Sequence, residues 1–110
     1  MNENKCRSAL EARWTELTRS ALPAVATGRR WPIRFDHCFA RVLLDNACGG
    51  VWYDRIAGRP AYRAAPDAVL AEAVRLGEAV LTGETALEPL NDRSLAWRRE
   101  RRAQAVPPLR

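Results

Sequence analysis

Apolar residues recur along much of the chain at the three- and four-residue spacing of a helix. Near the N-terminus this spacing places a group of them on one face: Cys6, Leu10, Trp14, Leu17 and Ala21. We therefore expect an amphipathic helix over residues 3–20, interrupted by Pro23 and followed by a loop over residues 23–32. No segment shows the alternation of apolar and polar residues that marks a half-buried strand.

The clearest helical pattern lies in the second half of the chain, over residues 66–82. Pro66 suits the first helical position, and Gly83 suits the residue after the last turn. Gly77 lies on the apolar face of this helix and destabilises it by about 1 kcal/mol relative to alanine. We expect this glycine to allow the close approach of another helix, formed by residues 37–47.

The remaining segments carry weaker patterns. Residues 51–62, "VWYDRIAGRPAY", mix aromatic, basic and turn residues, which predicts a short helical turn followed by a loop. Asn91 or Asp92 is suited to cap a last helix through "RSLAWRRERRAQ". Residues 106–110, "VPPLR", are expected to form a loose C-terminal tail.

Length and composition fit one folded domain. The chain has 110 residues, of which 47% are hydrophobic and 28% charged, the balance of an ordinary globular protein. We predict a single small all-α domain of four to five short helices over residues 1–105. Its core would be formed by the helices over residues 3–20, 37–47 and 66–82.

The same composition argues against several classes of protein. The N-terminus lacks the apolar core of a secretory signal, and no window approaches the roughly 18 apolar residues of a membrane span. A cytoplasmic protein without a membrane partner is therefore expected. The three cysteines, Cys6, Cys38 and Cys48, have no C-x-x-C spacing, which favours thiols over disulfides and predicts no metal site. No phosphate-binding or dinucleotide-binding glycine motif is present, so no cofactor is expected.

The stretch "RFDHCFARVLLDNACGG" gathers the only histidine with two cysteines, two arginines and two aspartates. A helix over residues 37–47 fits it, because Asp36 can cap the first turn and Gly49 or Gly50 can end the last. On that helix a polar stripe falls within one narrow arc, with Cys38 at its edge: His37, Arg41, Asp45 and Cys48. Most of the remaining surface of the helix is apolar, which predicts a central position in the fold.

Two interpretations of this stripe stay open. In the structural one, Arg41 pairs with Asp45 one turn later and the stripe is an internal polar seam. In the catalytic one, His37, Arg41 and Asp45 form an acid–base and anion-holding set, with Cys38 as a nucleophile. A direct dyad of His37 and Cys38 is disfavoured, because adjacent residues diverge by about 100° on a helix.

Charge points to a third kind of function. The chain carries a net charge of +5, and its cations are arginines except for Lys5. An arginine-rich, lysine-poor chain is also what a GC-rich genome would encode, so the bias alone does not specify a partner. The positions of the arginines along the chain are more informative about a partner. Arginines surround aromatic residues in three places, an arrangement that suits phosphate contact and base stacking.

These clusters predict the binding of DNA, RNA, another polyanion or a phosphorylated partner, and they are the leading prediction of function. The candidate binding residues are Arg29, Arg30, Trp31, Arg34, Arg55, Arg59, Tyr62, Arg63, Arg98, Arg99, Arg101 and Arg102. The last four are expected to be solvent-exposed and dispensable for folding. A small enzyme centred on the polar stripe is the alternative, and a protein-interaction subunit is the third interpretation. No feature of the sequence specifies an oligomeric state.

Overall fold

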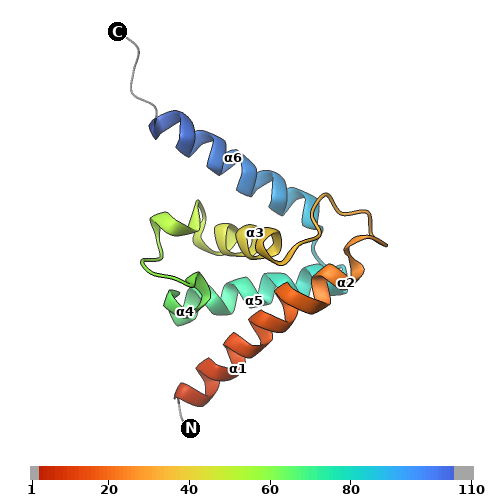
Figure 1. Cartoon of the computed structure of the whole chain (residues 1–110), viewed down its shortest axis with the longest axis vertical. Coiled ribbons are helices and arrows are strands. Elements are labelled where there is room, and N and C mark those ends of the chain that lie inside the picture. Colours follow the sequence, from red (N-terminus) through yellow and green to blue (C-terminus); the bar gives the residue numbers. More distant parts are fainter. Residues whose placement is uncertain (1–2, 106–110) are drawn as a thin grey trace.

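The computed structural model describes residues 3–105, and the predicted tail over residues 106–110 lies outside them. The described chain is helical and contains no strand, which confirms the all-α prediction (Figure 1). Its elements, in chain order, are α1 (Glu3–Glu16), a π-helical turn η1 (Leu17–Ala21), α2 (Leu22–Ala26), α3 (Asp36–Cys48), a 3₁₀ turn η2 (Trp52–Asp54), α4 (Ala61–Ala64), α5 (Asp67–Thr82) and α6 (Leu87–Ala105). None of these helices is long and apolar enough to cross a membrane.

The first three elements form one continuous helical rod, and the predicted break at Pro23 is wrong. The π-helical turn explains how the helix passes the proline. Leu22 donates its backbone N–H to the carbonyl of Leu17, five residues earlier, so the turn is wider than in an α-helix. Pro23 then falls in the first turn of α2, where the missing N–H needs no intrahelical partner. The loop therefore begins only after Ala26.

The core lies where α3 and α5 pack together and against the first rod. Phe39 and Leu43 of α3 and Leu17 of η1 are fully buried. A Cβ atom placed on Gly77 of α5 would lie 3.1 Å from Cδ1 of Leu17 and 3.2 Å from Cδ1 of Leu43. The predicted close approach at Gly77 is confirmed, and it involves η1 as well as α3. Cys6, by contrast, is exposed, so the buried face of the first helix does not extend to it.

The glycines predicted to end two helices do so, whereas the residues predicted at the starts of the same helices are each displaced by one position. Gly49 and Gly83 follow α3 and α5 in the left-handed conformation, with φ of 71° and 86°. Asp36, however, is the first residue of α3 rather than its cap. Likewise, Pro66 precedes α5 as its cap residue instead of opening the helix.

The last helix begins earlier than the predicted cap at Asn91 or Asp92. Pro89 falls within its first turn, where a proline removes no intrahelical hydrogen bond. The extra turn brings Leu87 and Leu90 into the core. From there α6 runs along α3 on the side opposite to α1. The helices α6 and α1 diverge from each other across the molecule (Figure 1).

The contact at Gly77 yields a test of this packing. Gly77→Val introduces two methyl groups where even a Cβ atom is tightly placed against Leu17 and Leu43. We expect it to lower the free energy of unfolding by about 1–3 kcal/mol, as overpacking does in a filled core. Urea denaturation measures the change. The control is Ala71→Val on the exposed side of α5, which should be nearly neutral; equal losses in both variants would contradict the close packing.

Candidate functional site

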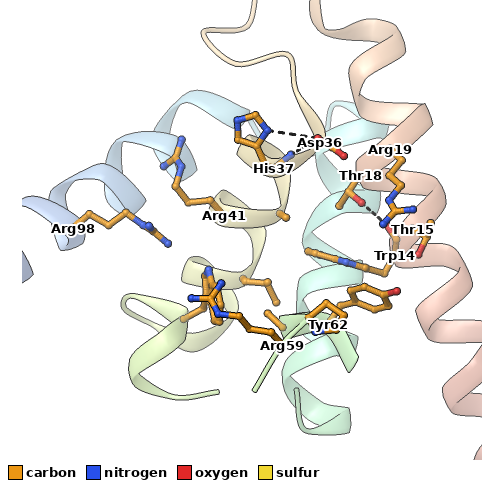
Figure 2. Close-up of a pocket in the computed structure, with 15 residues that line it drawn as sticks. Trp14, Thr15, Thr18, Arg19, Asp36, His37, Arg41, Arg59, Tyr62 and Arg98 are labelled. Atoms are coloured by element: carbon orange, nitrogen blue, oxygen red, sulfur yellow. Dashed lines mark hydrogen bonds and ion pairs between the residues drawn. The ribbon is translucent and has the colours of Figure 1, made fainter. Parts of the chain in front are cut away.

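A cleft of about 770 Å³ opens over the outward face of α3 (Figure 2). Its size falls in the range of small-molecule sites. Four residues of α3 form its floor at helical spacing: His37, Ala40, Arg41 and Leu44. The rest of the lining comes from α1 and η1, from the start of α3, from the stretch that runs from η2 into α4, and from α6: Trp14, Thr15, Thr18, Arg19, Asp36, Trp52, Arg59, Pro60, Ala61, Tyr62 and Arg98.

The lining is strongly basic. It contains four arginines, Arg19, Arg41, Arg59 and Arg98, but only one carboxylate, that of Asp36. That carboxylate is exposed at the start of α3, where it accepts the backbone N–H of the next residue at 2.7 Å. Among the side chains described, no carboxylate lies within ion-pair distance of the first three arginines. The cleft therefore presents more positive charge than the fold itself neutralises.

Arg98 is held in the cleft by the buried carboxylate of Asp45. Its Nε lies 2.7 Å from Oδ2 and its Nη2 lies 3.1 Å from Oδ1. Ser94 donates its hydroxyl to Oδ2 at 2.7 Å, and the backbone N–H of Trp52 donates to Oδ1 at 3.0 Å. The hydrogen bond with Asp45 raises the pKa of Arg98 above its usual value. One carboxylate thus ties together α3, α6 and η2.

Arg41 does not pair with Asp45, so the predicted ion pair within one helix is wrong. Its Nη1 donates to Oγ of Ser94 and its Nη2 to Oδ1 of Asn91, both at 2.8 Å. Burial, followed by the nearby charge of Arg98, lowers the pKa of Arg41. An arginine nevertheless stays protonated in proteins. Arg41 is therefore a half-buried cation that is oriented by neutral oxygens on α6.

Aromatic rings border the same space. The guanidinium carbon of Arg59 lies 5.4 Å from the ring centroid of Trp52, within the range of a cation–π contact. Figure 2 shows Arg98 extending from α6 and Arg59 from the segment before α4 toward the same part of the cleft. Tyr62 and the buried Trp14 lie on the α1 side. The arrangement can receive a ligand that combines an anionic group with a flat ring.

Only some of the predicted binding residues lie in the cleft. Those that line it are Arg59, Tyr62 and Arg98. Arg29 instead donates to the last carbonyls of α5, those of Val80 at 2.9 Å and Leu81 at 2.7 Å. Trp31 packs edge-on against Phe39, and Arg101 pairs with Asp54 at 2.9 Å. The other predicted arginines are exposed outside the cleft: Arg30, Arg34, Arg55, Arg63, Arg99 and Arg102.

The residues of the catalytic interpretation are separated in the same way. His37 and Arg41 line the cleft, but Asp45 is fully buried behind it and Cys38 does not line it. His37 Nδ1 lies 3.5 Å from Oδ1 of Asp36. Burial raises the pKa of the Cys48 thiol, which favours its protonated form. In the described chain no group of histidine, cysteine and carboxylate side chains could hold a metal ion.

The sequence patterns did not predict that the first rod forms one wall of the cleft. Arg19 and Thr18 belong to the π-helical turn, whose extra residue changes the direction of every following side chain. Trp14 is buried, as expected for a core tryptophan, yet it also borders the cleft. The basic and aromatic character of this wall was visible in the sequence, whereas its orientation toward α3 depends on tertiary packing.

The ion pair of Arg98 and Asp45 yields a second prediction. The expectation that the arginines after Trp97 are exposed and dispensable for folding does not fit Arg98, whose side chain is 21% exposed. Arg98→Met leaves the buried carboxylate without its cationic partner, and we expect the free energy of unfolding to fall by about 3 kcal/mol. The exposed Arg102→Met is the matched control and should change stability little. Urea denaturation measures the free energy of unfolding of both variants. Equal values for Arg98→Met and Arg102→Met would contradict a structural role for the ion pair.

Comparison of the chain with protein-family models, with curated protein sequences and with solved structures found no match. The chemistry of the cleft is therefore inferred from its own side chains. Those side chains combine guanidinium groups, two of them held by hydrogen bonds, with an exposed imidazole and aromatic rings around one opening. Together they give the opening an excess of positive charge next to flat aromatic surfaces.

Proposed function

We propose that the protein binds a phosphorylated ligand in the cleft, through Arg41, Arg59 and Arg98. The observation that carries this proposal is the unbalanced charge of the lining. Arg41 and Arg59 have no carboxylate partner among the described side chains, although both border a concave site. Such a site gains more from an incoming anion than an open surface does, because nearby protein atoms exclude part of the screening water.

Phosphate fits these groups better than a single carboxylate would. The planar fork of a guanidinium matches two oxygens of either group, but a phosphate has three terminal oxygens and up to two negative charges, so it can bind more than one arginine at once. Arg41 and Arg98 are already oriented by Ser94, Asn91 and Asp45, so little side-chain freedom is lost when a ligand binds. Arg59 is exposed and more adaptable, and it can close onto the ligand from the other side.

The aromatic part of the cleft favours a phosphorylated ligand that carries a ring. Trp52 is half-buried and already in contact with the guanidinium group of Arg59. Stacking of a nucleobase on such a ring combines well with phosphate contacts, as in proteins that bind unpaired nucleic acid strands. The arginines outside the cleft add long-range attraction for a polyanion without ordering it.

Nucleotide binding tests this proposal directly. We expect thymidine 5′-monophosphate to change the intrinsic tryptophan fluorescence, because Trp14 and Trp52 border the cleft. Its affinity should fall as salt concentration rises, since the contact is between ions. Arg59→Ser should weaken binding about tenfold, the effect of losing a charge-assisted hydrogen bond.

Arg102→Ser is the control for the loss of one positive charge, because Arg102 is exposed on α6 outside the cleft. It should retain affinity within about twofold, a difference that long-range attraction alone can produce. Equal weakening in both variants, or no binding at millimolar nucleotide, would contradict the cleft as the binding site.

His37 supports a second candidate function, hydrolysis or transfer of a phosphoester. It lies one turn before Arg41 on the floor of the same cleft, and an imidazole next to a phosphate can act as a general acid or base. We expect 4-nitrophenyl phosphate to be cleaved slowly and His37→Ala to abolish the cleavage while preserving nucleotide affinity. Absence of product above the buffer rate with the unmodified protein would exclude this activity toward that ester.

A further inference from the structure

An exposed aromatic pair continues the cleft past its rim. Phe35 precedes α3 and is 58% exposed, which is unusual for a residue with a phenyl group. Its ring is parallel to that of His37, with an angle of 3° between the planes and 5.8 Å between the centroids. Since His37 lines the cleft and Phe35 does not, the stacked pair joins a residue of the site to an exposed ring just outside it.

The start of α3 does not explain the phenyl group. The backbone carbonyl of Phe35 accepts hydrogen bonds from the N–H groups of Cys38, at 3.0 Å, and Phe39, at 3.2 Å. Any residue can supply that carbonyl, and the side chain makes no capping hydrogen bond. Ser, Thr, Asp or Asn would stabilise this helix start better. The aromatic ring is thus unnecessary for the local fold.

Positive charge accompanies the exposed pair. The guanidinium carbon of Arg34 lies 6.0 Å from the ring centroid of Phe35. Within the described side chains no carboxylate lies at ion-pair distance from Arg34. Asp36 is the nearest acid in the sequence, and it is engaged by the backbone N–H and the ring of His37. The surface next to the cleft therefore offers a stacking face together with an available cation.

We propose that the ligand of this protein is single-stranded nucleic acid, bound with one nucleotide in the cleft and the adjacent base on the Phe35–His37 pair. Arg34 contacts the phosphate that joins the two nucleotides. This inference rests on the proposed function of the cleft and extends it. Phe35 does not line the cleft, so a mononucleotide bound there has no contact with it, whereas the bases of a duplex are already paired and stacked. Stacking of this kind tolerates any base, so little sequence preference is expected.

Affinities for two probes test the proposal: thymidine 5′-monophosphate and a 5′-phosphorylated strand of four deoxythymidines. Phe35→Ala should weaken the binding of the strand by at least about fivefold, which is the lower end of the effect of losing one base–aromatic stack. It should leave the affinity for the monophosphate unchanged. Phe35→Trp should retain strand affinity because it preserves a stacking face. Leu95→Ala, at another exposed apolar side chain, is the matched control and should affect neither probe.

The outcomes separate the two proposals. If Arg59→Ser weakens the binding of both probes but Phe35→Ala leaves the affinity for the strand unchanged, the strand proposal is overturned and the cleft remains the proposed binding site. Failure of Arg59→Ser to weaken the monophosphate would overturn the cleft and, with it, the strand proposal. A complementary duplex that binds as tightly as the strand would also overturn it. Thermal unfolding of Phe35→Ala should match the unmodified protein, because the removed ring is exposed.

Discussion

The fold and the cleft both depend on the buried carboxylate of Asp45. It accepts hydrogen bonds from Arg98 and Ser94 on α6 and from the backbone N–H of Trp52 in η2. Ser94 in turn accepts from Arg41, so a single anion fixes one cation directly and another through a hydroxyl group. Without it, Arg98 would lose the contact that holds it in the cleft, and Ser94 would lose the acceptor of its hydroxyl group.

The two walls of the cleft are attached to the core by different forces. The first rod is fixed by apolar burial, with Trp14 and Leu17 in the core. Beyond its first turns, α6 packs on α3 mainly through polar and charged groups, including the pair of Arg98 and Asp45. A buried ion pair adds little net stability compared with apolar packing, but it imposes a specific direction on the charged groups. That property suits a wall whose side chains must point into a binding site.

Periodicity predicted most of the helices because burial in a small helical domain depends on one apolar face per helix. Gly77 even indicated where two helices meet. The passage through Pro23 was not predictable, since it needs a π-helical turn that no local residue preference specifies. The partner of Asp45 was missed for a related reason. Its neighbour at helical spacing, Arg41, was the obvious choice, whereas Arg98 is 53 residues away and reaches it only through the crossing of α6 over α3.

The π-helical turn also limits how the surface of the first rod can change. Through residues 17–21, an α-helix of ordinary pitch would rotate every following side chain by about 100° relative to its present direction. Leu22 and Ala26 would then leave the core, and Pro23 would lose its position in a first turn. The chain between Trp14 and Leu22 must therefore keep its present length to the residue. Exposed positions in this stretch outside the cleft, such as Glu16 and Ser20, can accept substitutions, but the stretch cannot accept an insertion or a deletion.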